Sequence, residues 1–474
     1  MQRLLRRTLP MTLAIACADH PGDAPALAAE PQDVGAGPRL THGPMVGDVR
    51  SQKAKIWLRL DGAAQVKVRT RVSGGSWGQP SAGEATGSDN TLTLSLTGLA
   101  ASTEYGYQLT ADNGASWTTE YKLETTPPDT DAATFSFVVL TDFEKAAAPA
   151  LSRALADQPD FGILLGDLDH RGPGNPDGDD DPSNDEAHYL REMRTMRREL
   201  RDASTGFGSA FIGTPTAPGF IVNPRHQIPM YYAWDDHDYC TNNADYLCPA
   251  RAQAFQVLQE YFVPGRDADF SPSGGSYQRI KYGKDAEIFV LDARAWRNHP
   301  AGSMLGNAQK QWLKSQLRAA QDADVKMKFV LSTVPFNKTT KDWDAWALFP
   351  AERQELVDFI RTEGITGVTI ISGDIHSGGA FDDGTHSDLP EMSSPQANMG
   401  DFVNTFLRKD PDLRPAHWTH GETDNGWPND GTDNPGYVRV DVDGPTRTAT
   451  VTVRDLQGNV RIANCGHRLT YTTP

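Results

Sequence analysis

Positive charge is scarce in this chain of 474 residues, which carries 45 lysines and arginines against 62 aspartates and glutamates and has a net charge of −17. A protein that captures nucleic acid must present a positive surface that displaces counterions from the phosphates. The composition therefore argues against nucleic acid as a partner, whereas a small phosphate ester still fits where bound cations reverse the local sign. At this length we expect two or more domains.

Long apolar runs are also missing, and beyond the amino terminus no segment is long and apolar enough to cross a membrane. The first 17 residues combine a basic region with a short apolar stretch, which is typical of an export signal. Arg6 and Arg7 fit a twin-arginine signal, and Ala26-Leu27-Ala28 offers a small-residue cleavage site. We expect a secreted or periplasmic monomer. Lipid anchoring through Cys17, with peripheral membrane association, is the alternative.

Cysteine is rare, with four residues in the chain. In an oxidising compartment Cys240 and Cys248, which are close in sequence, could form a disulfide, and two unpaired loop thiols are the equal alternative. Cys465 has no obvious partner.

The amino-terminal third of the chain has the pattern of a β domain behind a leader. Residues 1–37 are the expected export signal and flexible tether, and from residue 38 to 127 short segments alternate apolar and polar positions between turn residues. The segment from Leu99 to Tyr107 resembles the tyrosine corner of fibronectin type III domains. We expect a small fibronectin type III-like β-sandwich with a structural Tyr105 or Tyr107. The clearest strands are expected at Lys55 to Leu60, Val66 to Thr70 and Thr91 to Leu96.

Consecutive prolines at 127 and 128 mark the domain boundary, because they disfavour both helix and strand pairing. From residue 131 to 474 apolar strands alternate with helical stretches, which predicts a layered α/β domain. Alternating segments after Gly436 are expected to complete the second sheet of this domain. Helices are expected at Ala147 to Asp157, Asp185 to Leu200, Ala250 to Tyr261, Ala308 to Ala320 and Ala351 to Thr362, with strands at Glu287 to Leu291 and Lys328 to Leu331.

Four motifs of Asp and His are dispersed through the α/β region: Thr-Asp-Phe-Glu at 141–144, Gly-Asp-Leu-Asp-His at 166–170, Trp-Asp-Asp-His-Asp at 234–238 and Gly-Asp-Ile-His at 373–376. Three of them follow apolar runs, at Phe135 to Leu140, Phe161 to Leu165 and Val368 to Ile371. The carboxyl ends of parallel strands are where an open α/β sheet places its chemistry. Carboxylates and imidazoles suit hard or borderline cations, so the motifs predict a metal-dependent hydrolase.

The motifs, their order and the preceding β domain resemble the alkaline phosphatase D (PhoD-like) family of calcineurin-like metallophosphoesterases. The resemblance covers residues 38–474, and its most specific pieces are Trp-Asp-Asp-His-Asp-Tyr at 234–239, Leu-Asp-Ala-Arg at 291–294, Leu-Gly-Asn-Ala-Gln-Lys-Gln-Trp-Leu at 305–313 and Ser-Gly-Asp-Ile-His-Ser at 372–377. It implies a four-layer αββα sandwich with two or more metal ions. It also implies hydrolysis of phosphate monoesters or diesters by activated water, without a covalent intermediate.

Carried over by position, the resemblance implies a set of metal ligands. Asp142 takes a terminal position and Asp167 the bridging one, whereas His170 stands where the family usually has a tyrosine. Asp236 replaces the Asn of the superfamily, and Asn242 is an additional ligand or a phosphate contact. The implied ligands are Asp142, Asp167, His170, Asp236, Asn242, Asp374 and His376.

Two further residues match catalytic positions. His237 matches the superfamily histidine that protonates the leaving group, and the alternative is a buried histidine bonded to Asp235 or Asp238. Arg294 is a candidate phosphate clamp, because a guanidinium pairs bidentately with phosphate oxygens. The alternative for Arg294 is a salt bridge to Asp292 or another core acid.

The sequence departs from the family at the soft and phenolate ligands. Iron-binding members place a Cys after the first Asp, where this chain has Phe143, and His170 replaces the tyrosine. Calcium, iron, zinc and manganese all stay open. The alternative functions are a phospholipase D-like diesterase of the same family and a non-catalytic extracellular binding protein.

Overall fold

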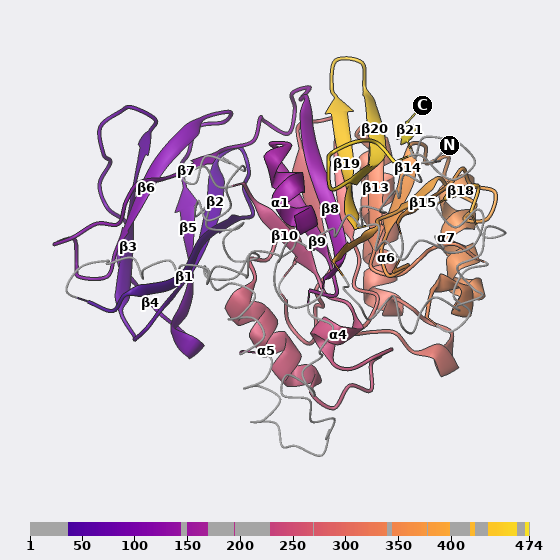
Figure 1. Cartoon of the computed structure of the whole chain (residues 1–474), viewed down its shortest axis with the longest axis horizontal. Coiled ribbons are helices and arrows are strands. Elements are labelled where there is room, and N and C mark those ends of the chain that lie inside the picture. Colours follow the sequence, from indigo (N-terminus) through magenta and orange to yellow (C-terminus); the bar gives the residue numbers. More distant parts are fainter. Residues whose placement is uncertain are drawn as a thin grey trace, which may run out of the picture.

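The computed structural model describes residues 37–143, 149–168, 194, 228–268, 270–338, 344–376, 378–398, 418–421, 435–461 and 470–473. A β-sandwich formed by the first seven strands lies beside a larger α/β region, as Figure 1 shows. The predicted helix from Asp185 to Leu200 lies outside the described residues, apart from Arg194, which is helical.

The β-sandwich has one sheet of three strands and one of four around an apolar core. This confirms the predicted sandwich, while its likeness to fibronectin type III domains stays a prediction. The Tyr105 hydroxyl accepts a hydrogen bond of 2.8 Å from the backbone N–H of Ala100, the contact expected of a tyrosine corner. The strands are β1 (Leu40–Gly47), β2 (Lys53–Leu60) and β5 (Thr91–Thr97) in one sheet, and β4 (Glu84–Ala85), β3 (Gln65–Val72), β6 (Glu104–Thr110) and β7 (Tyr121–Glu124) in the other.

The α/β region contains two sheets, and the first begins with three parallel strands. These are β8 (Phe135–Phe143), β9 (Phe161–Leu165) and β10 (Met230–Ala233). Antiparallel strands extend this sheet from β8: β19 (Gly436–Asp443), β20 (Thr448–Asp455) and β21 (Thr470–Thr472), while β17 (Gln396–Asn398) also pairs with β8. The segments after Gly436 therefore form strands of this region, as predicted, but they extend the first sheet rather than the second.

The second sheet is parallel through its centre, from β12 to β13, β14 and β16. The apolar runs predicted to be strands form β12, β13 and β14, with boundaries that differ by at most one residue. In spatial order the strands are β11 (Gln278–Tyr282), β12 (Ala286–Val290), β13 (Met327–Ser332), β14 (Val368–Ser372), β16 (Glu391–Ser393), β15 (Ala380–Asp382) and β18 (His420–Gly421).

Helices cover the outer faces of both sheets, so the region has four layers (Figure 1). Helices α1 (Pro149–Ala156) and α5 (Arg251–Tyr261) pack on the first sheet, and α6 (Gly306–Asp322) and α7 (Pro350–Thr362) pack on the second. These four helices were predicted to within three residues at each end. The remaining helical elements are α4 (Asp236–Tyr239) and the 3-10 turns η1 (Ser88–Asn90), η2 (His299–Ala301) and η3 (Trp346–Leu348).

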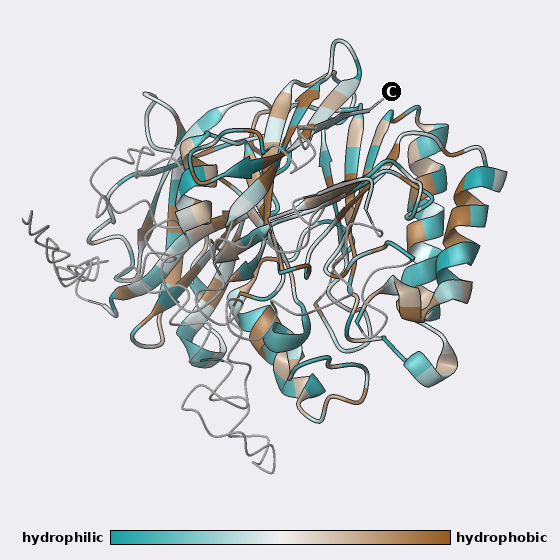
Figure 2. Ribbon diagram, turned by 45° about the vertical axis from the view of Figure 1, so that its right-hand side comes forward, coloured by the Kyte–Doolittle hydropathy of each residue, from teal (hydrophilic) through white to brown (hydrophobic). Residues whose placement is uncertain are grey.

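The core between the two sheets is apolar and aromatic. Brown stretches follow the inner strands in Figure 2, and the rings of Phe137 in β8 and Phe329 in β13 meet edge to face at 5.5 Å. Burial of apolar side chains is the main favourable term in folding. This core holds the carboxyl ends of the parallel strands of both sheets at one edge of the molecule.

The β-sandwich is anchored to α5. Trp57 of β2 is fully buried, its indole N–H donates to the carbonyl of Glu260 at 2.7 Å, and its ring lies 5.7 Å from that of Tyr261. Lys55 adds a hydrogen bond of 2.9 Å to the carbonyl of Pro264. A buried tryptophan with a satisfied N–H is a strong anchor between two packed units.

Candidate metal centre

The predicted ligand motifs meet where strands of the two sheets end close to one another. Asp142 is the penultimate residue of β8, Asp167 lies two residues after β9, and Asp236 follows β10. Asp374 and His376 follow β14 in the second sheet. A hypothetical Cβ on Gly373 would lie 2.7 Å from the Thr141 hydroxyl, so glycine permits this close approach of the sheets.

The backbone at these positions is unusual. Asp142, Asp167, Asp374 and His376 have φ values of 56°, 51°, 54° and 48°, in the left-handed region that costs a non-glycine residue about 1 kcal/mol or more. Such conformations persist only where the surrounding structure imposes them, and they cluster at functional sites. Here they turn the side chains at the strand ends toward one point.

The first donor group contains three carboxylates and an imidazole. Ligand atoms of Asp142, Asp167, Asp374 and His376 all lie within 4.8 Å of one another. Nε2 of His376 is 3.2 Å from Oδ1 of Asp374 and 3.9 Å from Oδ1 of Asp142. The three aspartates are 0%, 1% and 4% exposed, in the order of the chain.

A second donor group shares one residue with the first. Asp167, Asp236 and His237 also bring ligand atoms within 4.8 Å of one another. Asp167 is therefore the one residue common to both groups among the described residues. A carboxylate in this position can bridge two cations, which is the arrangement of two-metal sites.

Backbone hydrogen bonds orient the second group. The Asp236 carboxylate accepts from the backbone N–H of His237 at 2.9 Å and of Asn243 at 2.5 Å. Asp238 joins the two motif loops, since its carboxylate accepts from the backbone N–H of Leu168 at 3.1 Å and of Asp235 at 3.1 Å. The short helix α4 is thus fixed against the loop that carries Asp167.

Arg294 lies behind this group and is 0% exposed. Its Nη1 and Nη2 donate to the two carboxylate oxygens of Asp344 at 2.9 and 3.0 Å, and its Nε donates to Asp235. This geometry favours the salt-bridge alternative over a phosphate clamp. The acids are Asp235 and Asp344, whereas Asp292 contacts Arg294 by accepting from its backbone N–H at 3.1 Å.

The positive charge of Arg294 also acts on Asp236 of the second donor group. Nη2 of Arg294 lies 3.7 Å from Oδ1 of Asp236. Burial alone would raise the pKa of Asp236, but the positive charges of Arg294 and His237 outweigh it and lower that pKa. Burial opposes the charge of Arg294 in turn, yet the surrounding carboxylates raise its pKa well above the ordinary value. Asp236 therefore stays an ionised ligand candidate.

Two predicted ligands, His170 and Asn242, belong to neither donor group among the described residues. His170 lies outside the described residues. Asn242 is exposed in the loop after α4, and its neighbour Asn243 provides the backbone contact to Asp236.

The sequence analysis missed three supporting residues. Asp235 and Asp238 belong to the Trp-Asp-Asp-His-Asp motif, and the density of acids there was the available signal. Asp344 lies 50 residues from Arg294 in a segment without a motif, so nothing in the sequence indicated its role.

The donor set fits divalent cations. Carboxylate oxygens and an imidazole nitrogen are the ligands that zinc, manganese and iron accept, and calcium accepts the oxygens. Buried carboxylates at this spacing repel one another unless a positive charge lies among them. The shared Asp167 fits a site for two ions.

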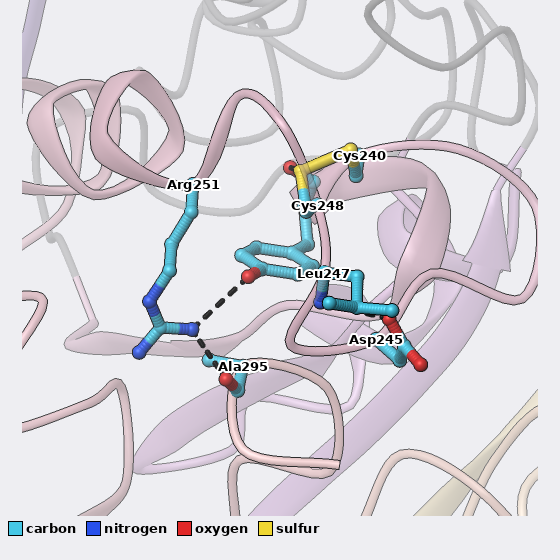
Figure 3. The surroundings of a disulfide bond; sticks show 7 residues. Cys240, Asp245, Leu247, Cys248, Arg251 and Ala295 are labelled. Carbon is cyan, nitrogen blue, oxygen red and sulfur yellow. Dashed lines mark hydrogen bonds between the residues drawn. A yellow bond between two sulfur atoms is a disulfide. The ribbon is translucent and has the colours of Figure 1, made fainter. Parts of the chain in front are cut away.

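A disulfide closes the loop that follows α4, which confirms the pairing of Cys240 with Cys248 (Figure 3). Arg251 of α5 supports the same region, because its Nη1 donates to the Tyr239 hydroxyl at 3.1 Å and to the carbonyl of Ala295. Burial raises the pKa of Tyr239 to about 12. The end of α4 is therefore tied covalently and by hydrogen bonds.

The four layers and the donor groups at the strand ends define a metallophosphoesterase-like protein. The sequence model of the PhoD-like phosphatase family matches residues 135–443, and the chain belongs to this family. Residues 37–129 match a domain of unknown function, DUF7800.

Comparison with individual proteins agrees with this assignment. The chain is 26% identical over 217 residues to alkaline phosphatase D of Bacillus subtilis (strain 168), a match that spans 38% of this chain and 36% of the relative. The structure of PhoD shares the fold with a TM-score of 0.64 at 18% identity, over 87% of this chain and 85% of that one. Purple acid phosphatase PPD1 from yellow lupin (Lupinus luteus) seeds has a TM-score of 0.58 at 12% identity, over 94% and 75% of the two chains.

Among the described residues, no helix has both the length and the apolar character that crossing a membrane would require.

Proposed function

We propose that this protein is an exported, metal-dependent phosphoesterase that hydrolyses small phosphate monoesters or diesters by direct attack of water. The observation that carries the proposal is the position of Asp167 in both donor groups. A family of phosphatases and a site that can hold two cations point to the same chemistry. The proposed partner is the small phosphate ester itself, and the proposed form is a monomer.

Each donor has a proposed role. Asp142, Asp374 and His376 would hold one ion, Asp236 would hold the other, and Asp167 would be shared by both. Bound there, divalent cations supply the nucleophile by lowering the pKa of a water molecule, and they offset the charge of the phosphate. Calcium, iron, zinc and manganese are the candidate ions.

His237 is the proposed general acid. It is only partly buried, and it lies with Asp167 and Asp236 at the edge of the site, where a leaving oxygen can reach it. A histidine in this position can donate the proton that the leaving oxygen needs. Arg294 supports this arrangement from behind rather than contacting the substrate.

Export is proposed on two grounds. The basic and apolar amino terminus has the pattern of an export signal. The disulfide between Cys240 and Cys248 supports an oxidising compartment, where such bonds persist.

The test is metal dependence measured together with hydrolysis. Purified protein is assayed on phosphate monoesters and diesters before chelation, after chelation and after addition of each candidate ion, with elemental analysis at every stage. We expect activity to disappear with the metal and to return with at least one ion. Full activity in metal-free protein would contradict the proposal.

A further inference from the structure

The loop between Cys240 and Cys248 exposes apolar side chains next to the donor groups. Among the residues that the structure describes, three large hydrophobic side chains are exposed: Val72 at 51%, Tyr246 at 38% and Leu247 at 68%. Two of the three are consecutive and lie in this loop. A single exposed apolar residue is ordinary, but an adjacent pair beside a site calls for a binding explanation.

The exposure of this pair is fixed by the structure of the loop. The disulfide closes the loop, and the backbone N–H of Tyr246 donates to the carbonyl of Arg297 at 3.1 Å. The backbone N–H of Leu247 donates to Asp245 at 2.8 Å, a contact visible in Figure 3. The apolar tip is therefore held toward solvent by covalent and hydrogen-bonded ties.

The loop that carries the tip is connected to the second donor group at two points. Helix α4 carries Asp236 and His237 and ends at Tyr239, one residue before the disulfide. The loop then returns to the site, where the N–H of Asn243 contacts the Asp236 carboxylate at 2.5 Å. Leu247 is four positions after Asn243, so their Cα atoms lie at most about 14 Å apart.

The proposed reaction determines which part of the substrate faces the loop. In-line attack places the water and the leaving oxygen on opposite sides of phosphorus. If His237 protonates the leaving oxygen, the departing alcohol lies on the α4 side, the side on which the loop after α4 begins. This step rests on the proposed function.

We propose that Tyr246 and Leu247 contact the carbon skeleton of the leaving alcohol and make the enzyme selective for phosphate esters of apolar alcohols. Burying alkyl surface against an already exposed leucine removes water from both partners. The contact is remote from the reacting bond, so it stabilises the bound substrate and the transition state alike. Selectivity should then appear in KM more than in kcat.

The experiment compares two esters that differ only in apolar length. Propyl phosphate and hexyl phosphate have leaving alcohols of similar basicity, and phosphate release gives kcat and KM for both with the metal-replete full chain. The variants are Leu247→Ser, Tyr246→Ser and Val72→Ser. Val72 is the matched control, because it is an exposed apolar residue in β3 of the β-sandwich.

We expect the wild-type chain to prefer hexyl phosphate, and Leu247→Ser to reduce that preference at least threefold through a higher KM for the longer ester. Tyr246→Ser should act in the same direction, whereas Val72→Ser should leave the preference within about twofold of wild type. Folding of each variant is checked by its melting temperature and metal content.

Three results would overturn the inference alone while the proposed function stands. They are an unchanged preference in Leu247→Ser, an equal loss in Val72→Ser, and a uniform fall in kcat on both esters. An unchanged preference together with lost binding to lipid vesicles would assign the tip to a membrane surface instead. Failure of the wild-type chain to hydrolyse either ester would overturn the proposed function and this inference with it.

Discussion

Two clusters of buried aspartates lie next to each other in this protein, and they satisfy their charges differently. The carboxylates of Asp142, Asp167 and Asp374 converge on one another and on the imidazole of His376. Those of Asp235 and Asp344 converge instead on the guanidinium of Arg294. We call the first the donor cluster and the second the guanidinium cluster.

This difference distinguishes the donor cluster, which could bind metal ions, from the guanidinium cluster, which supports it. In the guanidinium cluster Arg294 and Arg297 both contact Asp344, so fixed positive charge is built into the fold. In the donor cluster the carboxylates point into a shared space, and their backbone is held in the left-handed region. Removing one partner of a buried ion pair leaves an uncompensated charge and destabilises a fold, whereas convergent carboxylates suit a cation from outside. The same substitution should therefore have opposite effects in the two clusters.

The largest effect is expected for Asp167→Asn in the donor cluster. The change removes the charged ligand shared by both donor groups, so metal retention and hydrolysis should both be lost, by at least about 10³-fold in kcat/KM. The metal-free variant should be more stable than the metal-free parent by about 1 kcal/mol, because one like charge is gone. Elemental analysis and denaturant unfolding measure both expectations. Full metal occupancy in the variant would contradict the assignment.

The next effect is expected for His237→Ala, which lies at the edge of the donor cluster. Metal should be retained, and turnover should fall by about 10² to 10⁴-fold on alkyl esters, the range of general acid catalysis. Nitrophenyl esters should lose less, because their leaving group needs little protonation. An equal loss on both kinds of ester would mean that His237 is not the acid.

A third, smaller effect is expected for Asp344→Asn in the guanidinium cluster. The change leaves Arg294 and Arg297 buried without a full counter-charge, which should lower the free energy of unfolding by about 3 kcal/mol. Asp61→Asn is the control, since the Asp61 side chain is 35% exposed and contacts Arg39, which is 60% exposed, at 3.0 Å. Loss of a partly exposed pair should cost about 1 kcal/mol or less. Equal destabilisation in the two variants would remove the distinction between the clusters.

The sequence predicted much of this arrangement, but not the second cluster. The strands β8, β9 and β14 were found because each is a continuous apolar run followed by a ligand motif. Strand β10 was missed because it has only four residues, Met-Tyr-Tyr-Ala, too few to show a period. The left-handed backbone of Asp142 and the pairing of Arg294 with Asp344 come from tertiary contacts, which local sequence does not reveal.

A third kind of buried charge is an ammonium whose hydrogen-bond partners are neutral groups. Lys328 of β13 is 0% exposed, and its ammonium donates to neutral groups: the carbonyls of Val325 at 2.5 Å and Thr366 at 3.0 Å, and the side-chain oxygen of Gln321 at 3.2 Å. Burial, together with the like charge of Lys326, lowers the pKa of Lys328 to about 8, the direction expected where neutral groups surround a buried ammonium.

The smallest effect therefore concerns the pH dependence of Lys328→Met. With a folded pKa of about 8 and an ordinary value of 10.5, the unfolded chain binds more protons than the folded chain between these limits. Stability from this residue must then rise with pH across that window, because the charged form is the one that burial penalises. Between pH 8 and 9.5 the wild-type chain should gain on the order of 1 to 2 kcal/mol relative to Lys328→Met. Denaturant unfolding of both proteins at the two pH values measures this difference, and other titrating groups cancel in it. A constant difference would mean that the neutral partners hold the lysine charge as well as the aspartates hold that of Arg294.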